Sequence, residues 1–276
     1  MQLALEQKLA GKVPSEEVLI PGVLSWNDYQ KRRATWPAVR QSIGLDAVFH
    51  ESASLLFPPD LLVKAERIAD ENRNLPRDAV SIGIDPAEGG DYTVMVAIDE
   101  LGVIELLSKK TPDTSVITGE AIAFMNKHRV PPQRVFFDRG GGGKEHADRL
   151  TYQGYPVKSV GFGEAISQEP KRGVIHLEER ISIRTEKYAY KNRRVEMYAM
   201  LRERLQKGFG IPAELTELHR QLSPIPLCYD DEGRMYLPPK PELISIIGNS
   251  PDEADALVLA IYGLTVKVVR KLATAF

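Results

Sequence analysis

The sequence predicts a mixed α/β fold, in which helices flank a partly parallel sheet. From about residue 79, polar segments marked by prolines give way to short apolar runs, and these runs then alternate with helical patterns. The first three strands follow one another at hairpin spacing, whereas helices separate the last two. The first, fourth and fifth strands should therefore be parallel, and the second antiparallel. The expected strands are 79–84, 92–98, 103–109, 135–137 and 157–160.

Helical patterns surround these strands. One helix is expected to open at Pro58, and the last to start at Pro251; a hairpin is expected between 227–229 and 235–237. We predict an N-terminal helical extension or linker at 1–78 and a second domain at 79–276. The other expected helices are 115–129, 144–153, 186–207 and 213–222.

Composition excludes several classes of protein. The chain has 276 residues, of which 43% are hydrophobic and 27% charged, a balance typical of a globular protein. No apolar stretch approaches the ~20 residues that cross a bilayer. The N-terminal residues lack signal-peptide features, and the single Cys228 cannot form an internal disulfide, so we expect a cytoplasmic protein. A net charge of -2 excludes a globally basic nucleic-acid binder but allows a local basic stripe.

Two aspartates directly follow predicted strands. Asp85 follows the apolar run 82–84, and Asp138 follows the run 135–137. In open α/β sheets, ligands gather beyond the carboxyl ends of parallel strands, so neighbouring strands would bring both carboxylates to one site. Either aspartate alone is more simply explained as a turn residue. The pair together favours a functional site.

The last predicted helix carries two more aspartates. Ser250 is expected to cap it and Glu253 to reach back, which together form a capping box. Asp252 then fits a favourable charge at a helix N-terminus. Asp255 lies further in, beside an apolar run that predicts burial, so its carboxylate must be paired, hydrogen-bonded or bound to metal.

Convergent aspartates without an obligatory histidine or cysteine predict an oxygen-only metal site. Such a site suits Mg²⁺ or Mn²⁺. Two such ions, roughly 3.5–4 Å apart, can activate a water and stabilise the leaving oxygen of a phosphodiester.

Three motifs in this order resemble the nuclease domain of phage large terminase subunits. They are Gly-Ile-Asp-Pro-Ala at 83–87, Phe-Asp-Arg-Gly-Gly at 137–141, and Ser-Pro-Asp-Glu-Ala-Asp-Ala-Leu at 250–257. Residues 192–194 and 196–198 also look like that family. The resemblance covers about residues 79–265. It implies a ribonuclease H-like fold and divalent-metal-dependent cleavage of concatemeric viral DNA during genome packaging.

The resemblance also implies roles for individual residues. Asp85 would be the central ligand that bridges two metal ions, Asp138 the second-strand ligand and Asp255 the helix-borne ligand. Asp252 would be an auxiliary or alternative ligand, and Lys240 stands where family members carry a lysine. On this basis we expect Asp255→Asn to abolish cleavage, to leave the fold intact, and even to stabilise the metal-free protein by relieving repulsion.

Double-stranded DNA is the implied substrate. In a packaging context, the implied partners are an ATPase motor domain, a small terminase subunit and the portal, all acting in the host cytoplasm. The sequence contains no G-x-x-x-x-G-K-[ST] phosphate loop, so it is interpreted as a nuclease portion without its motor.

A basic stretch follows the fifth strand and extends into the next expected helix. Residues 168–194 contain eight basic and four acidic side chains, which leaves +4 in a chain that totals -2. The stretch either follows a DNA backbone or forms a solvated helix face. The candidate DNA-binding residues are Lys171, Arg172, Arg184, Lys191, Arg193 and Arg194.

Three alternatives remain open from the residues. Another ribonuclease H-like nuclease, such as a Holliday-junction resolvase, would share the carboxylates. An actin-like ATPase or sugar kinase is suggested faintly by 83–85 with Gly89, Gly90 and Thr93. A DNA-binding scaffold without catalytic activity is the third. Cleavage of plasmid without ATP separates a nuclease from the last two.

Overall fold

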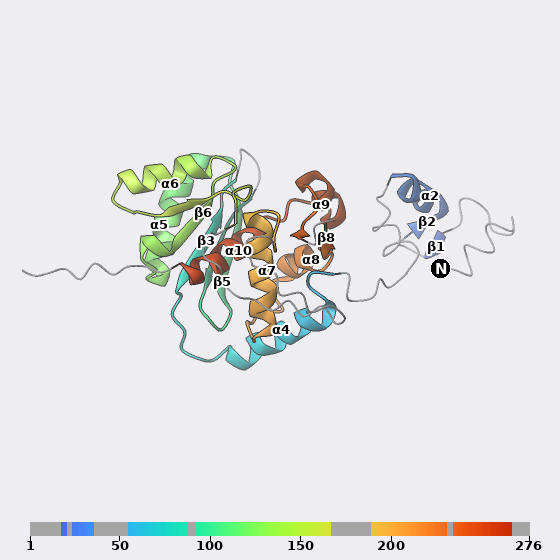
Figure 1. Ribbon diagram of the computed structural model, residues 1–276, viewed down its shortest axis with the longest axis horizontal. Coiled ribbons are helices and arrows are strands. Elements are labelled where there is room, and N and C mark those ends of the chain that lie inside the picture. The colour runs from blue at the N-terminus through green and yellow to red at the C-terminus, as the bar shows by residue number, and fades with distance from the viewer. Residues whose placement is uncertain are drawn as a thin grey trace, which may run out of the picture.

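A five-stranded mixed sheet organises the chain (Figure 1). The computed structural model describes residues 18–20, 24–35, 55–87, 92–166, 189–230 and 234–266. The strand order is β5-β4-β3-β6-β7. The strands are β3 (Ser81–Asp85), β4 (Tyr92–Ile98), β5 (Val103–Lys110), β6 (Val135–Asp138) and β7 (Lys158–Val160).

The predicted strand directions are confirmed. β3 is parallel to β6, and β6 is parallel to β7, whereas β4 is antiparallel to both β3 and β5. Helical connections lead into β6 and β7, as parallel neighbours require. The carboxyl ends of β3 and β6 therefore meet at the same edge of the sheet.

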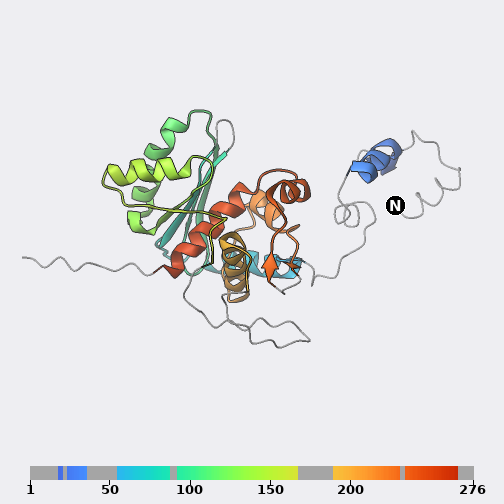
Figure 2. The same cartoon turned by 45° about the horizontal axis from the view of Figure 1, so that its top comes forward.

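Helices cover both faces of the sheet (Figures 1 and 2). On one face, α5 (Ile117–His128) and α6 (Gly143–Tyr152) share a core with Ile84 and Phe137. On the other face, α10 (Asp252–Thr265) packs against β3, β4 and β6 and shares a core with Phe136. Because side chains alternate along a strand, Asp85 and Asp138 point to the α10 face.

The close approach of α10 to β3 depends on a glycine. A Cβ atom at Gly83 would lie 2.0 Å from the backbone oxygen of Ala256 and 2.5 Å from the backbone nitrogen of Ala260. No larger residue fits there, so the strand and the helix backbone pack directly. This contact fixes the first turn of α10 relative to the carboxyl end of β3.

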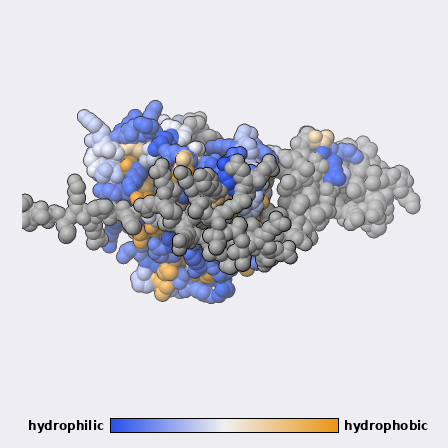
Figure 3. All heavy atoms as spheres, viewed as in Figure 1, coloured by the Kyte–Doolittle hydropathy of each residue, from blue (hydrophilic) through white to orange (hydrophobic). Residues whose placement is uncertain are grey.

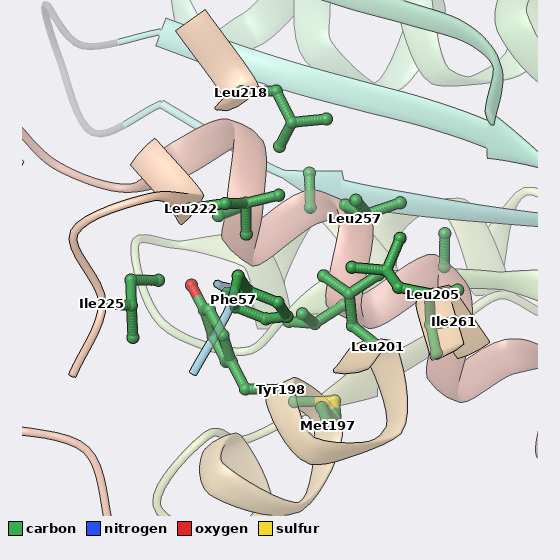
Figure 4. Close-up of a cluster of buried hydrophobic side chains, with 14 of the residues drawn as sticks. Phe57, Met197, Tyr198, Leu201, Leu205, Leu218, Leu222, Ile225, Leu257 and Ile261 are labelled. Atoms are coloured by element: carbon green, nitrogen blue, oxygen red, sulfur yellow. The ribbon is translucent and has the colours of Figure 1, made fainter. Parts of the chain in front are cut away.

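Helix α4 (Pro59–Asn72), which precedes the sheet in the chain, belongs to the same hydrophobic core as the sheet. It packs against α7 (Arg193–Gln206), and Leu56 and Phe57 are completely buried in the core that α10 shares. Figure 4 shows Phe57 among side chains of α7, α8 (Thr216–Leu222) and α10. The boundary predicted at residue 78 therefore divides one hydrophobic core, because the segment from Leu56 onward is needed to complete it.

Several predicted element boundaries need correction. Helix α7 begins at Arg193 and not at 186, because the Asn192 side chain accepts from the backbone N–H of Val195 and caps the helix there; residues 186–188 lie outside the described residues. Helix α9 (Lys240–Ile247) was not predicted from the sequence. Its short length and two neighbouring prolines hide the helical period.

The remaining described elements are a hairpin, two short 3₁₀ turns, and a two-stranded ribbon with one helix. The predicted hairpin is present as β8 (Cys228–Tyr229) and β9 (Met235–Tyr236). Two short 3₁₀ turns, at Thr114–Val116 and Pro132–Arg134, lead into α5 and β6. A two-stranded ribbon of β1 (Val18–Ile20) and β2 (Leu24–Ser25) precedes α2 (Trp26–Thr35), where the sequence predicts only short helices and turns.

Within the residues that the structure describes, no helix combines the length and the apolar character needed to span a membrane. On the face seen in Figure 3, hydrophilic residues dominate the described surface, with small hydrophobic areas between them.

Candidate active site

Asp85 and Asp138 lie side by side at the ends of β3 and β6. The strands pair in parallel, with Ile84 opposite Phe137, and the next step of that register brings the two aspartates together. Both project toward α10, on the face opposite the α5 and α6 core. Sheet topology thus places two carboxylates at one position without any contribution from loops.

The glycine run after β6 folds tightly around Asp138. The backbone N–H of Gly140 donates to the Asp138 carboxylate at 3.2 Å. Gly142 has φ +73° at the start of α6, and a Cβ at Gly143 would lie 1.8 Å from the backbone oxygen of Asp138. The loop therefore returns over the strand end, which only glycine at these positions permits.

A neighbouring helix caps the N-terminus of α10. The expected capping box at Ser250 is wrong, because α10 starts at Asp252 and makes no side-chain cap of its own. The backbone N–H of Ala254 instead donates to Oε1 of Gln221 in α8 at 3.0 Å. Nε2 of Gln221 in turn donates to Oε1 of Glu217 at 2.9 Å. Helix α8 thus fixes the turn that carries Asp252.

The Asp255 carboxylate is buried and fully engaged. Only 1% of Asp255 is exposed. Its Oδ1 accepts from Nη2 of Arg194 at 3.0 Å, from Nε of Arg194 at 3.3 Å and from the hydroxyl of Tyr198 at 2.7 Å. Its Oδ2 accepts from Nη2 of Arg194 at 2.9 Å. Of the explanations that the sequence left open for this residue, the ion pair is present in the structure.

Carboxylate crowding controls the electrostatics of the site. Burial raises the pKa of Asp85 well above its usual value, and the negative charges of Asp255, Asp138 and Asp252 raise it further. Burial, together with the charge of Asp255, raises the pKa of Asp138 to about 6, although the Gly140 N–H and nearby cations oppose the shift. The ammonium of Lys240, at the start of α9, lowers the pKa of both carboxyls.

The donor chemistry of these residues fits a divalent cation. Among the described residues, no hydrogen bond reaches the Asp85 carboxylate, and three other carboxylates act on it electrostatically. A hard cation with oxygen ligands would compensate that negative charge. In their present side-chain positions, no three His, Cys, Asp or Glu residues of the described part are gathered closely enough to hold an ion.

A cavity of about 340 Å³ opens beside Asp252, between α8, the start of α10 and the strands β4 and β5. Its lining includes Glu217, Asp252 and Glu253, and burial raises the pKa of Glu253. Carboxylates repel a phosphate, so this side of the site is unsuited to a DNA backbone.

Of the three predicted DNA-binding residues that the structure describes, one is exposed. Arg194 is buried and paired with Asp255, so it is not available to a phosphate; that prediction is wrong. The Arg193 side chain is 11% exposed and donates to Glu196 and to the Tyr262 hydroxyl, which also removes it from the surface. Lys191 is exposed, with its ammonium 5.5 Å from the Tyr236 ring centre. Lys171, Arg172 and Arg184 lie outside the described residues.

Sequence reasoning missed the partners of the last helix. Arg194 and Tyr198 are one helical turn apart on α7, a spacing that puts both on one face. That spacing was the available signal, but Arg194 was predicted to bind DNA, and Tyr198 was given no role in the site. Gln221 gave no signal, because nothing in its local sequence distinguishes a cap for a distant helix.

Comparison with solved structures gives one consistent result. The nuclease domain of the large terminase subunit gp2 of bacterial virus Sf6 superposes with a TM-score of 0.61 at 18% sequence identity, covering 75% of this chain and 98% of that chain. Substituted forms of the same domain, one with manganese and beta-thujaplicinol and one with calcium, give the same values. No protein-family model matches the sequence, and a search of curated proteins finds no match.

At this level of identity, the likeness establishes the fold. This chain has the mixed five-stranded sheet, the strand directions and the flanking helices that the sequence predicted. The chain therefore has the ribonuclease H-like fold of the nuclease domains of phage large terminase subunits.

Proposed function

We propose that this chain is a divalent-metal-dependent endodeoxyribonuclease and acts as the nuclease portion of a viral genome-packaging terminase. The observation that carries the proposal is the meeting of Asp85 and Asp138 at the ends of parallel strands, facing the carboxylates of α10. The fold is similar to that of the nuclease domain of the large terminase subunit gp2 of bacterial virus Sf6.

Asp85, Asp138 and Asp255 are the proposed metal ligands, with Asp252 as an auxiliary ligand. Asp85 is proposed as the bridging ligand, because the other three carboxylates all act on it. When bound, two Mg²⁺ or Mn²⁺ ions supply an activated water and stabilise the leaving oxygen of the phosphodiester. The carboxylates of the chain would hold these ions in place.

Lys240 and Arg194 balance part of the negative charge. With all four carboxylates ionised, these two cations leave a formal charge of -2. Lys240 acts on both Asp85 and Asp138, and Arg194 acts on Asp138. A site with this residual charge repels DNA until cations bind. Metal loading is therefore expected to precede productive binding of the scissile phosphate.

Double-stranded DNA is the proposed substrate, and Lys191 with the basic residues 171, 172 and 184 is proposed to contact its backbone. In a packaging context, an ATPase motor domain would deliver the DNA, with a small terminase subunit and a portal as further partners. The proposed location is the cytoplasm of the infected host cell. These assignments rest on the fold and on the resemblance of the three motifs.

The test is cleavage of supercoiled plasmid by the purified chain, without ATP, in Mn²⁺, in Mg²⁺ or in EDTA. We expect nicked and linear products with either metal and none in EDTA. Cleavage that survives EDTA or requires ATP would contradict the proposal. A strong preference for four-way junctions over linear duplex would favour a resolvase-type nuclease instead.

Two variants separate this site from a contaminating nuclease. Asp85→Asn should remove cleavage completely. Asp60→Asn is a matched control, because Asp60 is an exposed aspartate in the first turn of α4. Equal activity of both variants would show that the cleavage does not come from this site.

A further inference from the structure

The Asp255 carboxylate uses its two oxygens unequally. Three donor atoms converge on Oδ1: Nε and Nη2 of Arg194 and the hydroxyl of Tyr198. Only Nη2 of Arg194 reaches Oδ2. A carboxylate offers about four lone-pair positions, two on each oxygen. Oδ1 is therefore saturated, whereas Oδ2 retains one acceptor position.

We propose that Arg194 and Tyr198 are positioning residues that hold Asp255 by Oδ1, so that Oδ2 alone is presented to a metal ion. The proposal deepens the proposed function and rests on it, since it concerns the ligand geometry of the same site. Neither residue contacts the reacting phosphate. Both act through the orientation of Asp255.

The first turn of α7 is held firmly enough for this role. The backbone N–H of Arg194 donates to the oxygen of Phe162 at 3.0 Å, and that of Arg193 donates to Glu164 at 2.9 Å. The guanidinium of Arg194 lies 5.5 Å from the centre of the Phe162 ring. Residues 161–164 directly follow β7, which pairs with β6 and its terminal Asp138. Arg194 is thus tied to the strand ends that carry the other carboxylates.

Tyr198 is fixed by packing. It is completely buried, its ring centre is 6.3 Å from that of Phe57, and Figure 4 shows the ring among the apolar side chains of this core. Burying a hydroxyl in such a core is unfavourable unless it has a partner. The partner it has is Asp255, at 2.7 Å. The hydroxyl can therefore be removed while the ring stays in place.

Arg194 has a second connection to the site. Its charge also acts on Asp138 and lowers the pKa of that carboxyl. Partners that orient a metal ligand commonly account for 10–100-fold of the metal affinity.

The test measures Mn²⁺ binding to the full chain by isothermal titration calorimetry, with Tyr198→Phe as the main variant. We expect this variant to fold, to bind DNA normally in EDTA, and to bind Mn²⁺ about 10–100-fold more weakly. Cleavage should then recover at high Mn²⁺ concentration, which a loss of packing would not allow. Arg194→Lys keeps the charge but cannot span both oxygens, and should show the same shift.

Tyr262→Phe is the matched control. Its hydroxyl accepts from Nη1 of Arg193 at 3.2 Å, on the same pair of helices but away from Asp255. This control should bind Mn²⁺ like the original chain. Unchanged Mn²⁺ affinity and Mn²⁺ dependence of cleavage in Tyr198→Phe would overturn the positioning role and leave the proposed function standing. Absence of Mn²⁺ binding by the original chain would overturn both. If Arg194→Lys does not fold, Tyr198→Phe decides alone.

Discussion

Oε1 of Gln221 accepts a hydrogen bond from the backbone N–H of Ala254 at 3.0 Å, so helix α8 caps helix α10 across 33 residues of sequence. Gln221 is 2% exposed, and its amide is held in place by Glu217. The first turn of α10 carries two of the four aspartates of the candidate site. The orientation of Asp252 and Asp255 therefore depends on a residue outside the motif that contains them.

Replacing Gln221 by alanine should destabilise the protein. The Ala254 N–H loses its acceptor in a buried position, which costs about 1–3 kcal/mol. For a chain of this size, each kcal/mol corresponds to roughly 2–4 °C in melting temperature. Thermal melting with and without Mn²⁺ measures the effect. Gln153→Ala, at an exposed position after α6, is the control and should melt within about 1 °C of the original chain. Equal melting of both variants would show that the cap contributes nothing.

Two carboxylate substitutions should have opposite effects on the metal-free protein. Burial and three nearby carboxylates raise the pKa of the Asp85 carboxyl, so its charge is unfavourable in the metal-free protein. Asp85→Asn should therefore raise the melting temperature by a few degrees while abolishing cleavage. Asp255→Asn leaves the buried Arg194 without its counterion, which typically costs about 3–5 kcal/mol. This prediction differs from the sequence-based expectation that Asp255→Asn leaves the fold intact or stabilises it, because the sequence did not indicate the ion pair with Arg194. Thermal melting in EDTA checks both, and a stabilised Asp255→Asn protein would contradict the buried ion pair.

The stability of the metal-free protein should fall as pH rises through about 6. The pKa of Asp138 is about 6 in the folded state, against about 3.9 for an unfolded aspartate. A raised carboxyl pKa contributes stability that is fully present below the unfolded value and is lost as pH rises through the folded value. The free energy of unfolding should fall by at most about 3 kcal/mol over this change of pH.

Melting in EDTA between pH 5 and pH 7.5 tests this dependence. Asp138→Asn should reduce this dependence, because the amide does not titrate, whereas the Asp85 carboxyl, whose pKa is also raised, still does. Mn²⁺ competes with the proton, so its affinity for the original chain should rise over the same interval. A melting temperature that rises steadily from pH 5 to pH 7.5 in the original chain would contradict the assignment.

Local sequence patterns predicted the framework of the site. The apolar runs that end at Asp85 and Asp138 predicted parallel strands, which bring both carboxylates to one sheet edge when the strands are neighbours. The structure shows that β3 and β6 are neighbours. The apolar run after Asp255 correctly indicated burial. For the five strands of the sheet, the type of element and the strand directions followed from apolar runs and their spacing, which are properties of short segments.

Tertiary partners were beyond those patterns. Arg194 and Asp255 are 61 residues apart, and a basic residue in a basic stretch has no local feature that marks it as buried. The capping box at Ser250 satisfied every local rule, yet Gln221 supplies the cap. In both cases, a side chain from another helix satisfies a polar group of α10, and no pattern within a short segment identifies that partner.

The salt dependence of DNA binding should distinguish surface cations from buried ones. Lys191 is exposed, so if it contacts a phosphate, Lys191→Ala should reduce the slope of log K against log salt by about 0.9. Lys207→Ala is the control, because Lys207 is exposed at the far end of α7 and pairs with Glu203. Arg194 is buried against Asp255, so Arg194→Lys should leave the slope unchanged even where it weakens Mn²⁺ binding.

Fluorescence anisotropy with a duplex in EDTA, over a series of KCl concentrations, measures the slope for all three variants. An unchanged slope for Lys191→Ala would assign that residue to a solvated face, and a flatter slope for Arg194→Lys would place its guanidinium on the DNA.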